Sequence, residues 1–187
     1  MSICIFTTGG TFDKVYFDAK SDYQIGEPMV GEILQEAGVL EPCRVESILK
    51  KDSLELTDED RALICQSVAK APEQRILIIH GTDTMAYTAS ALAFLLPGLD
   101  RPVVLTGSQT PLGDIRSDAR TNLVDACHLA TLRIPEVGIA FDSKLLRGCR
   151  ATKLDAWGMS AFGSPSCPPL AELGLGVQLG SHILPPR

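Results

Sequence analysis

The chain has 187 residues, of which 45% are hydrophobic, 21% charged and 5% aromatic. This length and composition predict one well-buried domain and exclude an intrinsically disordered chain. The formal net charge is −6, with no block of like charges. The sequence therefore disfavours nucleic acid and anionic membranes as partners.

The first eleven residues are MSICIFTTGGT. They lack a basic segment followed by a long apolar stretch, so we expect no signal peptide. No apolar run approaches the roughly 20 residues that cross a bilayer as a helix. The six cysteines show no CxxC or CxH spacing, which weakens the zinc and disulfide interpretations. We therefore expect a cytoplasmic protein with reduced thiols, no metal and no cofactor.

Five short β-rich runs recur along the first 141 residues. The first, third and fourth are apolar almost throughout, as expected for parallel strands that are covered on both faces. The predicted strands are residues 2–6, 44–48, 75–79, 102–106 and 137–141.

Four helices are predicted after successive strands. The first begins at Pro28, and the second begins at Thr57, a capping residue followed by three acids. The third covers residues 85–96 and is apolar nearly all round, which indicates either deep burial or a subunit interface. The fourth begins at Ser117 and Asp118.

This alternation predicts an α/β fold, a doubly wound and mainly parallel sheet flanked by helices. Such sheets bind ligands in the crevice beyond the carboxyl ends of their strands. The segments that follow the predicted strands are rich in hydroxyls, glycine and acid, and we expect them to converge. They are residues 7–11, 52–53, 80–84 and 107–110.

Beyond Phe141 the pattern weakens. Residues 142–153 are predicted to hold a short extra strand or a hairpin. The chain is rich in proline and glycine from Ser164 onward. We therefore expect one domain over residues 1–165 and an irregular C-terminal tail over residues 166–187, with at most one short strand.

The segment TTGGTF, residues 7–12, is the glycine-rich turn after the first predicted strand. It lacks both the GxGxxG and the GK[ST] patterns of phosphate-binding loops. Its glycines permit a sharp turn and a close approach to a ligand, while Thr11 presents a hydroxyl at the mouth of the crevice. A purely structural turn explains this segment equally well when it is taken alone.

The segment IIHGTDTM, residues 78–85, places Thr82 and Asp83 ahead of a helix N-terminus that can bind an anion. An acid beside hydroxyls can orient a nucleophile or bind a substrate ammonium. The alternative is that Asp83 and Thr84 only cap the helix. His80 emerges from an apolar strand without a Gly-x-Ser-x-Gly elbow, so we interpret it as structural.

Taken together, TTGGTF and IIHGTDTM resemble the two signature motifs of the L-asparaginase family of threonine amidohydrolases. Further segments follow in the family's order over residues 1 to about 170. SDYQIG (residues 21–26) is similar to the family's lid with its tyrosine, and DSLELT (residues 52–57) is similar to the substrate-carboxylate loop. GSQTPL (residues 107–112), with Arg116, Asp118 and Asn122, is similar to the cytoplasmic-type branch. RATK (residues 150–153), with FGSP (residues 162–165), is similar to the segment with a catalytic lysine.

The resemblance implies hydrolysis of L-asparagine to L-aspartate and ammonia, with a catalytic role for five residues. Thr11 would be the nucleophile that attacks the side-chain amide carbon, and Tyr23 on the lid would hydrogen-bond it. Thr82, Asp83 and Lys153 would form the second catalytic cluster. A threonine hydroxyl needs such neighbours because it is a poor nucleophile without a base or a cation beside it.

The resemblance also implies a substrate pocket. Ser53 and Asp83 would hold the α-carboxylate and the α-ammonium, and Gly10 would line the pocket. The Ser108 backbone would contact the amide being cleaved, and the Thr82 amide would contribute to an oxyanion hole. The expected assembly is a homo-oligomer, a dimer or a tetramer.

Three features depart from the family pattern. Most members carry a second domain, and this chain ends where that domain would begin. We therefore expect that another face of a symmetric oligomer or the tail supplies the contacts of that domain, or that these contacts are lost. Leu54 and Glu55 replace a polar residue and a shorter acid, which removes one hydrogen bond worth roughly 0.5–1.5 kcal/mol. Phe12, Tyr16 and Phe17 make the lid bulky. We predict weak affinity for asparagine and poor use of glutamine.

Three rival functions remain open. A catalytically silent amino-acid sensor would keep the crevice, but it would have little use for Lys153. A nucleotide-binding protein is disfavoured because the phosphate-binding fingerprint is absent. A component of a tRNA-dependent amidotransferase would normally bring a basic RNA-recognition segment, and the sequence contains none.

Overall fold

A computed structural model describes residues 2–10, 14–17, 22–25 and 30–185 of the chain. Its centre is an eight-stranded sheet in the order β12-β11-β8-β7-β6-β5-β1-β4. Neighbouring strands from β4 to β7 run parallel, and β8, β11 and β12 are added antiparallel. The strands are β1 Ile3–Thr7, β4 Cys43–Ser47, β5 Ile76–Ile79, β6 Val103–Thr106, β7 Val137–Phe141, β8 Lys144–Arg147, β11 Ala171–Leu173 and β12 Val177–Leu179.

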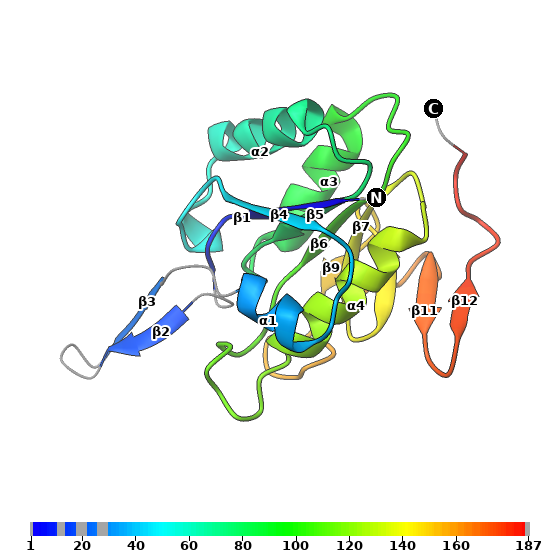
Figure 1. Ribbon diagram of the computed structural model, residues 1–187. Coiled ribbons are helices and arrows are strands. Elements are labelled where there is room, and N and C mark those ends of the chain that lie inside the picture. Colours follow the sequence, from blue (N-terminus) through cyan, green and yellow to red (C-terminus); the bar gives the residue numbers. More distant parts are fainter. Residues whose placement is uncertain (1, 11–13, 18–21, 26–29, 186–187) are drawn as a thin grey trace.

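Helices cover both faces of this sheet (Figure 1). Helices α1 (Val30–Glu36) and α4 (Ala119–Thr131) lie on one face, and α2 (Asp58–Lys70) and α3 (Met85–Leu95) lie on the other. The strands therefore send alternate side chains into two cores. The doubly wound, mainly parallel α/β fold predicted from the sequence is confirmed.

Strand β1 marks the point where the strand order reverses. The chain crosses from β1 to β4 on one side and later continues from β5 to β7 on the other side of β1. Each residue of β1, β5 and β6 is buried, as their continuous apolar sequence predicts. Strand β4 forms the sheet edge and is mostly exposed, which explains its charged residues.

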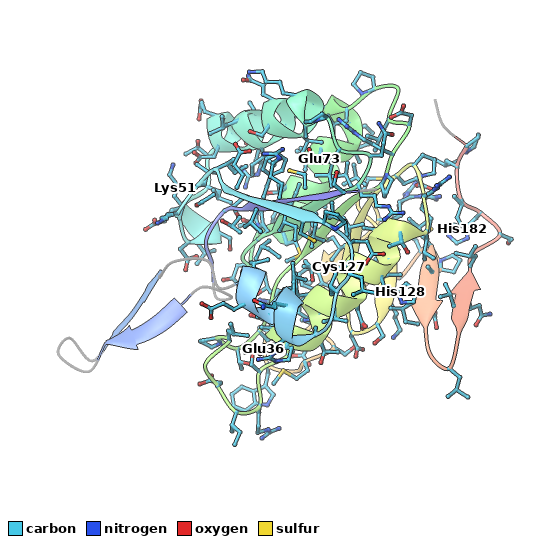
Figure 2. All side chains as sticks on the ribbon, viewed as in Figure 1. Glu36, Lys51, Glu73, Cys127, His128 and His182 are labelled. Carbon is cyan, nitrogen blue, oxygen red and sulfur yellow. The ribbon has the colours of Figure 1, made fainter. Side chains whose placement is uncertain are left out.

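The start of α2 is capped as its sequence predicts. The backbone N–H of Asp60 donates to the Thr57 hydroxyl at 3.3 Å, and the Thr57 backbone N–H donates to the Asp60 carboxylate at 2.9 Å. Lys51 Nζ also donates to Asp60, at 2.7 and 2.9 Å. Lys51 lies on the connection between β4 and α2 (Figure 2). These contacts fix both ends of the segment that contains the 3-10 helix η2, Ser53–Glu55.

Helix α3 is buried along one side only. Met85, Ala89 and Leu92 are fully buried, but Tyr87 is 68% exposed and Phe94 is 77% exposed. Burial against the described residues therefore does not explain the apolar sequence of this helix. In the part of the chain that the structure describes, no helix combines the length and the apolar character needed to span a bilayer.

The chain beyond β7 is more regular than the sequence indicates. Strand β8 forms the expected hairpin with β7. Strand β9 (Thr152–Lys153) pairs with β10 (Phe162–Gly163), and β2 (Lys14–Phe17) pairs with β3 (Asp22–Ile25) in a separate hairpin.

The segment expected to be an irregular tail adds β11 and β12 to the main sheet. These strands form because β8 would otherwise leave unpaired backbone N–H and C=O groups at the sheet edge. The N–H groups of Leu170 and Leu173 donate to the carbonyls of Leu145 and Ser143, at 2.7 and 2.8 Å. Such pairing depends on the edge of the sheet and not on an apolar pattern in the tail.

Candidate active site

The loops after β1 and β5 meet at the point of strand-order reversal. Gly10 has a φ of +99°, and a Cβ atom on it would lie 2.7 Å from the Cα of Gly81. Only glycine combines this left-handed conformation with so close an approach of two backbones. The two glycines thus bring the TTGG and HGTD segments together at the carboxyl ends of their strands, where doubly wound folds bind ligands.

The segment with Ser53 is packed against the same place. A Cβ atom on Gly81 would lie 2.7 Å from both Cβ and Oγ of Ser53. The Thr84 hydroxyl donates to the Ser53 carbonyl at 2.7 Å, and the Asp52 carboxylate accepts from the Leu54 N–H at 3.1 Å. Ser53 is buried and packs closely against the loop that contains Gly81.

Thr82, Asp83 and Lys153 form one contact cluster. Lys153 Nζ donates to Thr82 Oγ1 at 2.9 Å and to Asp83 Oδ1 at 2.8 Å. Lys153 lies on strand β9, opposite Phe162 of β10. Phe162 packs against Phe141, with ring centroids 5.0 Å apart, and this contact anchors β10. The Lys153 side chain is only 18% exposed, whereas that of Asp83 is 48% exposed.

The hydroxyl of Thr82 has a defined direction. It accepts from Lys153 and donates to Gln109 Oε1 at 3.0 Å. Gln109 Nε2 donates to the Gly158 carbonyl at 3.1 Å, which fixes the orientation of the amide. A cation beside the hydroxyl oxygen favours the alkoxide form of the threonine.

Two groups at the site have unused hydrogen-bonding capacity among the described residues. Among the described residues, none donates to the second oxygen of Asp83, Oδ2, and this carboxylate reaches solvent. The Ser108 hydroxyl is buried and has no hydrogen-bond partner in the same part of the chain. A buried polar group of this kind usually finds a partner. The site can therefore receive a molecule with a cationic end and further polar groups.

His80 lies directly behind the site and has a structural environment. It is fully buried, and burial lowers the pKa of its imidazole to about 4. Nδ1 is 2.8 Å from the Gly81 carbonyl, so it carries the proton and donates, and Nε2 accepts from the Thr88 hydroxyl at 2.8 Å. A neutral histidine with both nitrogens in use fits the structural interpretation made from the sequence.

The structure thus brings six of the sequence-predicted site residues together: Gly10, Ser53, Thr82, Asp83, Ser108 and Lys153. Two others cannot be compared. Thr11 lies outside the described residues, and Tyr23 belongs to β3, of which only the backbone is described. No group of three or more potential metal-ligating side chains occurs among the residues described.

Three residues that shape the site have no role in it that was predicted from the sequence. Gln109 contacts Thr82, and Asp118 and Asn122 bind the backbone of the loop that carries Gln109. A signal for the last two was present, because polar residues four positions apart share one side of a helix start. It gave no indication of which backbone groups they would contact.

Comparisons with known proteins point to one family. The family model "Asparaginase, N-terminal" matches residues 2–184. L-asparaginase 1 of Escherichia coli is 45% identical over 130 residues, covering 68% of this chain and 38% of that protein. One component of the glutamyl-tRNA(Gln) amidotransferase of Thermoplasma acidophilum is 34% identical over 184 residues, covering 91% of this chain and 44% of that protein.

A similar structure is that of L-asparaginase I from Vibrio cholerae. It superposes with a TM-score of 0.88 at 36% identity, covering 100% of this chain and 58% of that one. The chain therefore spans between about two fifths and three fifths of the length of these proteins.

Proposed function

This chain belongs to the asparaginase family, and we propose that it hydrolyses the side-chain amide of L-asparagine to L-aspartate and ammonia. One observation carries the proposal. A lysine nitrogen is shared between the Thr82 hydroxyl and the Asp83 carboxylate at the carboxyl ends of the strands. Simple binding of an amino acid does not require a cation aimed at a hydroxyl oxygen, but activation of that hydroxyl does.

The proposed reaction has two halves. In the first, Thr11, which follows Gly10 in the sequence, attacks the amide carbon; the C–N bond breaks, and the nitrogen leaves as ammonia after taking up a proton. In the second, water attacks the resulting threonine ester, which releases aspartate and restores the hydroxyl. Thr82 and Lys153 move protons and activate the water in this scheme. The Thr82 N–H contributes to an oxyanion hole, worth about 3–4 kcal/mol on mutagenesis precedent.

The same residues account for recognition of the amino-acid end of the substrate. Ser53 holds the α-carboxylate, and the open oxygen of Asp83 holds the α-ammonium. The Ser108 backbone contacts the amide being cleaved. Leu54, which is 72% exposed, has an apolar side chain, so it offers the carboxylate no hydrogen bond. We therefore propose weak affinity for asparagine and poor use of glutamine.

The proposal extends to assembly and location. Residues 1–165 are the catalytic unit, and the tail of residues 166–187 adds β11 and β12 to its sheet. The exposed apolar side chains of α3 support a homo-oligomer, a dimer or a tetramer. All six cysteines are free thiols, which supports a reducing, cytoplasmic location.

A second candidate is the release of ammonia within an amidotransferase complex. The similarity to a protein named as part of such an enzyme favours it. The net charge of −6 opposes direct contact with tRNA. In this case the cluster would perform the same amide hydrolysis, and turnover would depend on a partner protein.

The test is ammonia release from L-asparagine at pH 7 to 9 by the wild type, Thr11→Ala and Lys153→Met. Turnover in the wild type and its loss in both variants would support the threonine and lysine mechanism. No turnover in the wild type, with asparagine still raising its melting temperature, would overturn hydrolysis by this chain alone and would leave an amino-acid sensor or the partner-dependent second candidate.

A further inference from the structure

Asp118 occupies the N-cap position of α4, yet its carboxylate does not cap that helix. It faces the loop after β6, residues 107–110, which we call the β6 loop. Both carboxylate oxygens accept from the Gln109 N–H at 3.0 Å, and Oδ1 accepts from the Thr110 N–H at 3.2 Å and from the Thr110 hydroxyl at 3.3 Å. Two consecutive backbone amides thus donate to one acid, and such charge-assisted bonds are stronger than neutral ones.

Asn122, one helical turn further on, completes this clamp. Its Nδ2 donates to Asp118 Oδ2 and to the Gly107 carbonyl, both at 3.0 Å, and its Oδ1 accepts from the Asp142 N–H at 3.3 Å. Asn122 is only 4% exposed. The β6 loop is therefore held at the carbonyl of its first residue and at the amides of its last two.

Residues of the β6 loop also reach the candidate active site. Gln109, whose N–H donates to Asp118, accepts a hydrogen bond from the Thr82 hydroxyl with its side-chain oxygen. Ser108, between the two held points, carries the buried hydroxyl that lacks a partner among the described residues. A shift of this backbone would move both groups relative to Thr82, since they are attached to it directly.

We propose that Asp118 is a positioning residue for the amide hydrolysis proposed above, on which this inference rests. Its carboxylate, steadied by Asn122, holds the β6 loop so that Gln109 sets the direction of the Thr82 hydroxyl and Ser108 faces the substrate amide. Asp118 itself touches neither Thr82 nor Lys153. Its effect on turnover passes through the backbone of Gln109.

The first experiment compares Asp118→Asn with Asp114→Asn. Asparagine has nearly the shape of aspartate, but its NH2 group would oppose one of the N–H donors that the carboxylate now accepts. We expect kcat for asparagine to fall roughly 10- to 100-fold with KM changed less than threefold, since small displacements of catalytic groups mainly slow the chemical step. Asp114 lies on the same segment and is exposed, and Asp114→Asn should retain wild-type kcat.

A double-mutant cycle separates positioning from a general loss of stability. If Asp118 acts through Gln109, then Asp118→Asn should reduce kcat by less than threefold in a Gln109→Ala background. Losses in kcat that multiply in the double variant would overturn the inference, as would a kcat for Asp118→Asn within twofold of the wild type. The kinetic constants are to be expressed per folded molecule, from circular dichroism at the assay temperature.

Amide hydrogen exchange provides a readout that does not depend on turnover. The amides of Gln109 and Thr110 should be protected in the wild type and in Asp114→Asn, and should exchange at least tenfold faster in Asp118→Asn. Equal protection in all three proteins would overturn the clamp. If the clamp is observed but the wild type releases no ammonia from asparagine, the proposed function has failed and with it the link from Asp118 to that reaction.

Discussion

Lys153 Nζ lies 2.9 Å from Thr82 Oγ1 although the two residues are separated by 71 positions in the chain. One belongs to the loop after a central parallel strand, and the other to a two-residue strand beyond the parallel part of the sheet. The contact therefore requires that β9 be held against the site by its pairing with β10. It is the geometric basis for the first prediction.

Lys153→Arg should reduce ammonia release from asparagine at least 100-fold. Arginine keeps the positive charge, and it can still pair with Asp83, but it cannot act as a base. Steady-state kinetics at pH 8 would measure the loss, with the melting temperature as a check on folding. Lys144→Arg is the matched control, because the Lys144 side chain at the start of β8 is 42% exposed. Activity of Lys153→Arg within tenfold of the wild type would mean that charge alone suffices.

Asp83→Asn should lower selectivity for the α-amino group. A hydrogen bond to a charged partner is worth roughly 1.5–3 kcal/mol, so kcat/KM for asparagine should fall roughly 10- to 100-fold. Because Asp83 also contacts Lys153, the informative measure is the ratio of kcat/KM for asparagine to that for succinamic acid, which lacks the amino group. The ratio should fall by a similar factor, and an unchanged ratio would place the ammonium elsewhere.

The sequence predicts the parallel core closely, and the physical reason is burial. Each parallel strand lies within one residue of its predicted position. For β1, β5 and β6 the reason is that strands covered on both faces must be apolar throughout, whereas β4 is an exposed edge strand. Strands β11 and β12 were expected to be irregular, since their formation depends on the free edge of β8 and not on their own side chains. In the site, topology predicts that hydroxyls and acids meet, but the Gln109 contact with Thr82 depends on a backbone position that Asp118 sets. No pattern in the sequence specifies that position.

Gly81→Ala should disturb both stability and substrate binding. The added Cβ would lie 2.7 Å from Ser53 Cβ and Oγ, and overpacking of this kind costs roughly 1–3 kcal/mol. Displacement of Ser53 should also raise KM for asparagine. Urea denaturation and kinetics would measure the two effects.

The control for Gly81→Ala is Gly31→Ala in helix α1, where an added Cβ would meet no atom of the described residues within 4 Å. This variant should be more stable by roughly 0.5–1 kcal/mol, because alanine loses less backbone entropy than glycine in a helix. Wild-type stability and KM in Gly81→Ala would contradict the packing of Ser53 against this loop.

Stability should fall between pH 7 and pH 5 because of His80. Burial lowers the pKa of His80 from 6.5 to about 4 in the folded protein. Below pH 6.5 the unfolded chain therefore binds a proton that the folded protein does not bind until about pH 4, so unfolding becomes more favourable as the pH falls. The linkage amounts to about 2 kcal/mol between pH 7 and pH 5.

Chemical denaturation at several pH values would test this linkage. His80→Gln should be less stable at pH 7, because the Thr88 and Gly81 contacts are disturbed, but its stability should depend less on pH over this range. His128, which is exposed on α4 (Figure 2), supplies the control: His128→Gln should keep the wild-type dependence. Were His80→Gln to keep it as well, the pH dependence would have to come from groups other than the buried histidine behind the site.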